Sequence, residues 1–294
     1  MPKVLVAGAT GYLGKHLVQT FKKEGYNVRA LVRNEQKLSK TGPFLEPAVD
    51  HLVDDVWVGD VTESESIKGV CEGVDFVCSA VGLTRQKGSL TFHDVDYQGN
   101  LHLLHEAQKE NVGKFMYIHV CGDRQMNNPI VNAKSAFVRE LRNSGLNYIV
   151  VKPTGYFSDM TEYLKMAQKG RVFLRDKGEN RVNPIHGEDL ADFCVSALRE
   201  HDDTVLEVGG PHEYRHAEIG AIAFGVLRKK ERYFNIPAPL LLVLLPVLKI
   251  FNKKQYALGK FFLDIMTKDI LARAYGRKNL SDYFLEYLEA DKKS

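Results

Sequence analysis

Residues 3–14 read KVLVAGATGYLG, and this stretch decides the fold of the chain. Residues 3–7 are a short apolar run of strand character, and the glycines that follow open a helical pattern. Gly8 permits a sharp turn without a Cβ clash, Gly11 lets backbone N–H groups approach a phosphate, and Gly14 lets the helix pack close to the strand. The free N–H groups and the dipole at the start of the helix favour an anion. This order of strand, glycine turn and helix predicts a dinucleotide pyrophosphate site.

The spacing of these glycines is GxxGxxG, which differs from the GxGxxG of the usual dehydrogenase fingerprint. A glycine pattern alone is weak evidence, and its position directly after an N-terminal strand makes it much stronger. We expect the turn to contact the cofactor through Gly8, Thr10, Gly11, Tyr12, Leu13 and Gly14.

The composition of the 294 residues is that of an ordinary globular protein, with 44% hydrophobic and 26% charged residues. A net charge of +3 is too small to indicate a nucleic-acid partner. The four cysteines lack CxxC spacing, which favours reduced intracellular thiols over a disulfide or zinc framework. His93, His102 and His105 share a helical segment, but we interpret them as ordinary histidines and expect no metal site. Because no signal peptide precedes the first strand and no apolar run reaches membrane-spanning length, we expect a cytoplasmic protein.

Strands and helices alternate through the first half of the chain. The pattern predicts a Rossmann-type α/β fold, with a doubly wound parallel sheet in residues 1–155. Expected strands are 3–7, 27–32, one within 51–58, 74–81, 114–120 and 147–151, and expected helices are 63–70, 92–110 and 131–143. Ligands of such sheets bind beyond the carboxyl ends of the strands, so the residues after Gly82, Val120 and Val151 should line the site.

The pattern loosens after residue 155. We expect residues 156–294 to form a smaller C-terminal substrate lobe that is interleaved with the sheet and helical at its end. Its predicted helices are 159–168 and 187–199, its predicted strands are 171–174 and 204–208, and further helices extend to about residue 288.

The second strand indicates which nicotinamide cofactor is preferred. Residues 28–33 read VRALVR, without the carboxylate that NAD sites place at this strand end. Arg33 can instead pair with a 2′-phosphate, so we predict NADP(H). Asp60 either accepts from the adenine amino group or caps the helix that follows, where Thr62 is an equally good candidate. Further expected cofactor contacts are Val61, Ala80, Gly82, Lys134 and Pro153.

Together these stretches resemble the short-chain dehydrogenase/reductase superfamily, and most closely its atypical branch of NmrA-like and isoflavone-reductase-like proteins. The resemblance covers about residues 1–215 and is strongest in the first 155. It rests on residues 4–14, 28–34, 59–61, 79–82, 115–120, 133–134, 152–155, 183–186 and 188–191.

The resemblance fails at the catalytic residues. The superfamily normally uses a Ser and a Tyr-Lys pair spaced YxxxK, in which the Tyr is the acid or base. Lys134 matches the Lys, but Ile130 stands at the Tyr position and His119 stands where Ser is usual. No Tyr lies in residues 121–133, so the standard carbonyl-reduction machinery is absent from the sequence.

Three alternatives follow. Lys134 acts alone, as the isoflavone-reductase-like resemblance implies, and supports reduction of an activated double bond. Alternatively His119 donates the proton, since its unperturbed pKa suits that role. In the third alternative the chain binds NADPH without turnover, as NmrA-like regulators are thought to do. We place the substrate pocket at Tyr156, Phe157 and His186, where Tyr156 either replaces the missing hydroxyl or simply lines the pocket.

The apolar segment 240–251 is bordered by Lys and Arg residues and offers a separate hypothesis. It either lies on an anionic membrane surface, which would suit a lipophilic substrate such as a quinone or isoprenoid, or is buried in the second lobe or a dimer interface. The sequence thus predicts an NADPH-dependent reductase of a small or lipophilic molecule, or alternatively a non-catalytic NADP(H)-binding regulator or assembly factor. It gives no reading of the oligomeric state.

Overall fold

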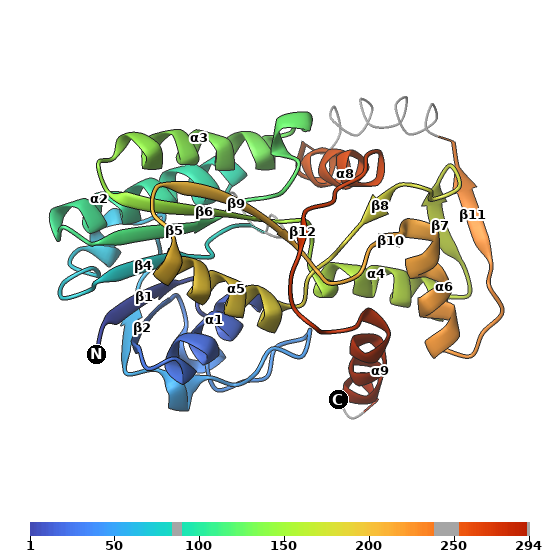
Figure 1. The fold of residues 1–294 in the computed structure, drawn as a ribbon, viewed down its shortest axis with the longest axis horizontal. Helices are drawn as coiled ribbons and strands as arrows, with labels where there is room; N and C mark the ends of the chain where they lie inside the picture. Colours follow the sequence, from blue (N-terminus) through green and yellow to red (C-terminus); the bar gives the residue numbers. More distant parts are fainter. Residues whose placement is uncertain (84–89, 238–252, 293–294) are drawn as a thin grey trace. The chain divides into compact units, whose positions relative to one another are not determined.

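The computed structural model describes residues 1–83, 90–237 and 253–292. Eight strands form a parallel sheet in the order β12-β9-β6-β5-β4-β1-β2-β3 (Figure 1). The strands are β1 (Lys3–Ala7), β2 (Asn27–Val32), β3 (Asp55–Val58), β4 (Phe76–Ser79), β5 (Lys114–Ile118), β6 (Asn147–Pro153), β9 (Thr204–Gly209) and β12 (Arg273–Ala274). Pairs of β1 with β2 and with β4 place the reversal of strand order at β1, as expected for a Rossmann-type sheet.

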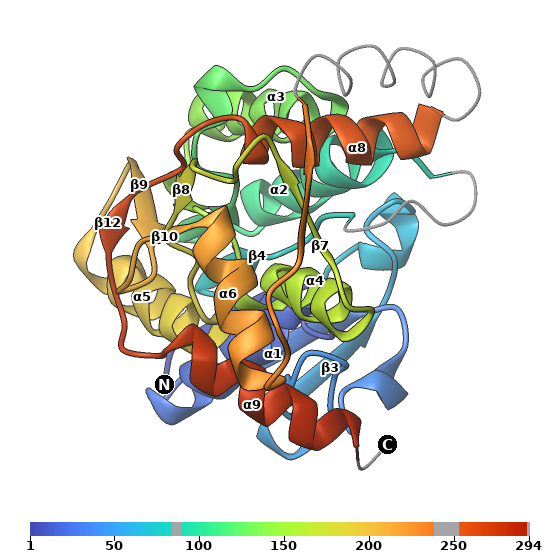
Figure 2. The same cartoon turned by 90° about the vertical axis from the view of Figure 1, so that its right-hand side faces the viewer.

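Helices cover both faces of the sheet, which confirms the doubly wound α/β class. Figures 1 and 2 show α1 (Tyr12–Lys23) and α5 (Gly187–Glu200) on one face, and α2 (Asn100–Lys109) and α3 (Pro129–Asn143) on the other. The Thr20 hydroxyl of α1 donates to Asp192 of α5 at 3.2 Å, so these two helices lie side by side. Parallel strands buried on both faces read as continuous apolar runs, and Leu5, Val77 and Phe115 are accordingly fully buried.

The expected helix at 63–70 is wrong. Only a 3₁₀ turn forms there, over Ser64–Ile67. The Ser66 hydroxyl donates to the carbonyls of Asp60 and Glu63, and the Ser66 carbonyl accepts from the Trp57 indole at 3.0 Å. Side-chain bonds of this kind compete with the helical backbone pattern. Gly69, at φ +80°, then turns the chain away from a helix.

The expected helix at 92–110 forms, but it begins with a π-helical turn over His93–Gly99 before α2. Such turns insert one extra residue per turn and frequently occur at functional sites. Here the turn faces α3 and carries Asp96.

The chain divides into two compact units. The first comprises residues 1–120, 129–152 and 190–206, and the second comprises the remainder. The second unit contains α4 (Phe157–Gln168), α6 (His216–Val226), α8 (Lys253–Met266) and α9 (Leu280–Asp291). It also contains two ribbons, antiparallel β8 (Arg181–Val182) with β10 (Tyr214–Arg215), and parallel β7 (Val172–Arg175) with β11 (Tyr233–Ile236). The membrane hypothesis for 240–251 falls outside the described residues.

Among the described residues, we find no helix that combines the length and apolarity needed to span a bilayer.

Candidate functional site

In the glycine turn after β1, Gly8 and Gly14 are the positions where a side chain meets close backbone contacts. Gly8 has φ +81°, a conformation that favours glycine, and a Cβ there would lie 3.1 Å from the Ala80 carbonyl oxygen. A Cβ on Gly14 would lie only 2.0 Å from the Gly8 carbonyl oxygen. The turn is closed by the Gly11 N–H, which donates to the same carbonyl at 2.9 Å. These close distances explain why glycine is needed at positions 8 and 14.

The start of α1 is suited to an anion. Gly11 is its N-cap residue, and no side chain caps the first turn. The first turn carries no acidic residue, so nothing there opposes the positive end of the helix dipole. Gly11 is exposed and Thr10 and Tyr12 are partly exposed, whereas Leu13 is buried in the core. The backbone N–H groups of this turn fit the pyrophosphate of a dinucleotide.

Arg33 follows β2 directly and extends into solvent. Its side chain is 67% exposed, and Nη1 lies 3.8 Å from Asp60 Oδ2. An exposed pair at this distance contributes little, so the guanidinium is available to a phosphate. The second Asp60 oxygen accepts from the backbone N–H and hydroxyl of Thr62 at 2.9 and 2.8 Å. Asp60 therefore holds the turn at Thr62 with one oxygen, where the sequence alternative expected the cap of a helix that does not form.

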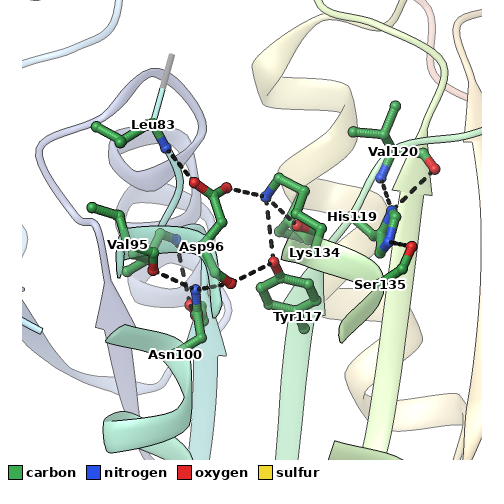
Figure 3. Close-up of polar contacts among 12 residues, drawn as sticks. Leu83, Val95, Asp96, Asn100, Tyr117, His119, Val120, Lys134 and Ser135 are labelled. Carbon is green, nitrogen blue, oxygen red and sulfur yellow. Dashed lines mark hydrogen bonds and ion pairs between the residues drawn. The ribbon is translucent and has the colours of Figure 1, made fainter. Parts of the chain in front are cut away.

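Lys134 lies at the centre of a buried polar network in the first unit (Figure 3). Its Nζ is 3.2 Å from Asp96 Oδ1, and the Asp96 side chain is completely buried while that of Lys134 is 12% exposed. Nζ also donates to the Ile118 carbonyl at 3.2 Å and to the Tyr117 hydroxyl at 3.4 Å. A Cβ placed on Gly82 would lie 3.1 Å from Nζ, so the chain after β4 passes directly beside the amine. The structure thus brings Gly82 and Lys134 together.

Asp96 is held from several sides. Its Oδ2 accepts from the Leu83 N–H at 3.1 Å. The Asn100 amide donates to the Asp96 carbonyl at 3.1 Å, and Asn100 itself accepts from the Ser79 hydroxyl at 2.5 Å. Burial raises the pKa of the Asp96 carboxyl, whereas the Lys134 charge acts to lower it. Desolvation also raises the pKa of Tyr117 well above its ordinary value, so that phenol stays neutral.

His119 is buried and engaged by its neighbours. Its Nδ1 accepts from the Val120 N–H at 2.6 Å, and its Nε2 lies 3.1 Å from the Ser135 hydroxyl. Nδ1 also lies 3.2 Å from the Val120 carbonyl oxygen, so both ring nitrogens have polar partners. This arrangement favours a positioning function for His119 and leaves Lys134 as the better candidate for proton transfer.

The three predicted pocket residues all belong to the second unit. Tyr156 precedes α4 and forms a parallel bridge with Ile185. The Phe157 ring is 1% exposed and packs 5.6 Å from both His186 and Tyr283, measured between ring centroids. Burial lowers the pKa of His186 to about 4, so its imidazole is neutral at physiological pH. Phe157 and His186 thus form one aromatic cluster, and their contact with a substrate remains a prediction.

A sequence model described as NAD(P)H-binding matches residues 8–201, which is about two thirds of the chain. The chain belongs to this NAD(P)H-binding family. Solved structures of similar fold include epimerases and reductases, and this likeness agrees with the fold expected from the sequence. The matched range contains the glycine turn, Arg33, Asp96 and Lys134, so the features described above lie within the family's nucleotide-binding domain.

Two kinds of protein are similar over most of the chain. Divinyl chlorophyllide a 8-vinyl-reductase of Arabidopsis thaliana is 25% identical over 320 residues, covering 97% of this chain and 76% of that protein. Photosystem II assembly factor Ycf39 of Cyanophora paradoxa is 30% identical over 221 residues, covering 74% of this chain and 66% of that protein.

Two solved structures share the fold over nearly the whole chain. NADPH-dependent quinone oxidoreductase QOR2 of Escherichia coli, solved with NADPH, has a TM-score of 0.76 and 14% identity, covering 97% of this chain and 99% of that chain. Triphenylmethane reductase of Citrobacter sp., solved with NADP(H), has a TM-score of 0.74 and 17% identity, with the same coverage. At these identities the likeness concerns the fold.

Other predicted cofactor residues of this NAD(P)H-binding chain lie at strand ends. The Ala80 N–H extends the pairing of β4 with β1 by donating to Ala7, and the Pro153 carbonyl at the end of β6 accepts from the Cys121 N–H. Val61 is buried, and its carbonyl lies 2.8 Å from His102 Nδ1. Each of these residues stays a prediction for cofactor contact.

Sequence reasoning missed Asp96 and Tyr117. One signal was available for Asp96. Asp96 and Asn100 are polar residues on the helix face that otherwise carries Phe92, Leu103 and Ala107, all of which are buried. A polar side chain on an apolar face is the informative exception in such a pattern.

Proposed function

We propose that this chain is an NADPH-dependent reductase of a small or lipophilic organic molecule, with Lys134 as the group that handles the proton. The substrate class is a quinone, an enone or a conjugated vinyl group. The observation that carries the proposal is the buried Lys134 amine, fixed beside Gly82 at the carboxyl end of β4.

The cofactor half of the proposal rests on three features of the first unit. The glycine turn and the uncapped start of α1 fit a pyrophosphate. The exposed Arg33 guanidinium fits a 2′-phosphate, because guanidinium binds phosphate through charge-assisted and bidentate bonds. No carboxylate at the end of β2 is present to select the free 2′-hydroxyl of NAD.

The chemical half of the proposal starts from what the cofactor supplies, which is a hydride. A substrate that accepts a hydride at one atom must gain a proton at another, so that its double bond or quinone carbonyl is reduced by two electrons. The Lys134 ammonium offers that proton or stabilises the enolate-like charge that develops. A cation suffices where an activated double bond is reduced, so the absence of the YxxxK Tyr is compatible with this substrate class.

The relatives support this substrate class. A vinyl reductase is similar over 97% of the chain, and a quinone oxidoreductase has the same fold. The first name describes reduction of a vinyl group, and the second describes redox chemistry of a quinone.

Calorimetric titration with NADPH, NADP⁺, NADH and NAD⁺ tests the cofactor. We expect NADPH to bind most tightly, and equal NADH affinity would contradict the assignment of Arg33. A screen of quinones, enones and vinyl-substituted aromatics for NADPH oxidation then tests the reaction. Lys134→Met, which keeps the length of the side chain without its amine, should lower turnover by about 10²-fold or more. Unchanged turnover in this variant would remove Lys134 from the chemistry.

A second candidate function is a non-catalytic NADP(H)-sensing regulator or assembly factor. It is favoured by Ile130 at the position of the usual Tyr and by the similarity to an assembly factor over 74% of the chain. This alternative would be favoured if the chain bound NADPH tightly but oxidised it with no substrate class. The affinity for NADPH should then be the same in Lys134→Met as in wild type.

A further inference from the structure

The partner of the Lys134 amine carries a further inference, which rests on the proposed function of that lysine. We propose that Asp96 is a positioning residue that keeps the Lys134 amine charged and fixed beside Gly82. Asp96 acts through Lys134 and has no direct contact with substrate in the proposal.

Polar groups from several elements face the Lys134 amine. Asp96 of the π-helical turn, the Tyr117 hydroxyl and Ile118 carbonyl of β5, and the Gly82 backbone after β4 surround it. His119, which follows β5, lies with Nε2 3.1 Å from the Ser135 hydroxyl, and the Tyr117 phenol is neutral because burial raises its pKa. Within the described part of the first unit, Asp96 is therefore the carboxyl that faces the Lys134 amine, and the Lys134 charge opposes the rise that burial causes in the Asp96 pKa.

The charge of Asp96 can be distinguished from the size and hydrogen bonding of its side chain. A buried ion pair is not required for stability, since apolar replacements are often as stable. If Asp96 served only to fill space and accept hydrogen bonds, Asp96→Asn would have little effect. The asparagine amide oxygen can accept from Leu83 or Lys134 in the same volume. If its charge matters, asparagine leaves the amine buried without a counter-ion, and burial favours the neutral amine.

The experiment compares wild type with Asp96→Asn, using NMR of isotopically methylated lysines to follow Lys134 as a function of pH. Lys134→Arg identifies the resonance. We expect the pH dependence of the Lys134 resonance to differ between the two proteins, because Asp96→Asn removes the carboxylate that lies 3.2 Å from Nζ. Identical titration of the two proteins would overturn the proposal. This readout needs no substrate, so it decides the proposal even where the reductase function fails.

Activity gives an independent readout where a substrate is found. In Asp96→Asn, kcat should fall about tenfold or more at alkaline pH and recover towards acid pH, with the KM for NADPH little changed. Asp96→Glu, which keeps the charge, should retain the wild-type pH profile at a lower rate. Asp94→Asn is the matched control, because its partly exposed carboxylate bonds Thr91 of the same turn. An equal loss at every pH in Asp96→Asn would make the role merely structural.

A second observation concerns the ribbon of β7 and β11 in the second unit. Phe173 and Phe234 are direct partners across the two strands, 43% and 50% exposed, with ring centroids 5.6 Å apart. The opposite face of the ribbon packs inward, since Val172 is buried and lies with Tyr233 against Gly220 of α6. Figure 1 shows β7 and β11 side by side, next to α6. The two phenylalanines therefore project from the outer face.

Cations border this aromatic pair. Strand alternation puts Arg171 on the phenylalanine face, and its guanidinium lies 6.0 Å from the Phe234 ring centroid. Other cations on this face or in the turn before β11 are Arg175, Lys229, Lys230 and Arg232. Two carboxylates lie nearby, and Asp176 pairs with Arg175 at 3.1 Å while Glu231 is exposed. The balance of charge around the pair is positive.

We infer that this face docks on an anionic lipid surface. Aromatic side chains enter the headgroup boundary while flanking Lys and Arg meet the lipid phosphates. Single-stranded nucleic acid is a poorer fit, because the two rings pack edge to face and offer no stacked platform for successive bases.

Co-sedimentation with vesicles of phosphatidylglycerol and phosphatidylcholine, compared with phosphatidylcholine alone, tests this inference. We expect binding only to the anionic vesicles, reduced about tenfold in Phe173→Ser/Phe234→Ser and in Arg171→Gln/Arg232→Gln. Val58→Ser, which removes an equally exposed apolar side chain from β3, is the control and should leave binding unchanged. Vesicle binding unaffected by both double variants would overturn the inference. The inference would also be overturned if the protein bound a labelled single-stranded oligonucleotide and did not bind the anionic vesicles.

Discussion

Replacing Gly14 by alanine should destabilise the first unit, whereas the same change at Gly11 should not. The Cβ that alanine adds at position 14 would lie 2.0 Å from the Gly8 carbonyl oxygen, and real Cβ atoms do not approach closer than 3.0 Å. Helix α1 would have to retreat from β1 by about 1 Å, and overpacking of this kind costs about 3 kcal/mol. At a size of about 150–250 residues, that loss lowers the midpoint of thermal unfolding by roughly 6–12 °C.

Gly11 provides the contrast. It has φ −81°, which alanine adopts, and its Cβ would lie 3.3 Å from the same oxygen. We expect a loss of stability below about 1 kcal/mol in Gly11→Ala. The added methyl group would nevertheless stand where the cofactor phosphates approach, and NADPH affinity should fall about tenfold, or about 1.4 kcal/mol.

Thermal unfolding and calorimetric titration with NADPH, run on both variants, measure the two effects separately. Wild-type stability in Gly14→Ala would refute the argument from close packing. Wild-type NADPH affinity in Gly11→Ala would refute the assignment of this turn to the cofactor phosphates.

Three further predictions concern other residues. Arg33→Ala should raise the Kd for NADPH about tenfold and leave that for NADH unchanged in calorimetry, since only the 2′-phosphate needs the guanidinium; parallel losses would contradict the assignment. Burial lowers the pKa of His186 and His216 to about 4, so the unfolded chain binds more protons between pH 6.5 and 4. Stability should therefore fall as pH is lowered through this window, by up to about 3 kcal/mol for each histidine. In His186→Asn and His216→Asn, the free energy of unfolding measured with urea should depend less on pH. Asp189→Ala should destabilise the second unit by about 1–3 kcal/mol and speed tryptic cleavage at residues 277–278, whose N–H groups donate to the buried carboxylate at 3.1 and 2.9 Å; an unchanged cleavage rate would exclude this anchoring role.

The sequence determined most of the first unit, because its signals are local. A strand followed by GxxGxxG fixes a turn that only glycine permits, and the continuous apolar runs mark parallel strands buried on both faces. The missing carboxylate after β2 and the missing Tyr at position 130 are also readable, since each depends on one residue at a known offset from an element. The error at 63–70 arose because the Ser66 side chain and the Trp57 indole take backbone partners that helical periodicity does not reveal.

Only the tertiary structure decided what surrounds the Lys134 amine. Asp96 lies 38 positions earlier in the sequence and reaches Lys134 through a π-helical turn, while Tyr117 comes from the intervening strand β5. No local pattern encodes such a contact, because it depends on how two helices and a strand pack together. The sequence therefore determined that this chain binds a dinucleotide, and the packing of distant elements decided that the Asp96 carboxyl lies beside Lys134, the residue we propose to handle the proton.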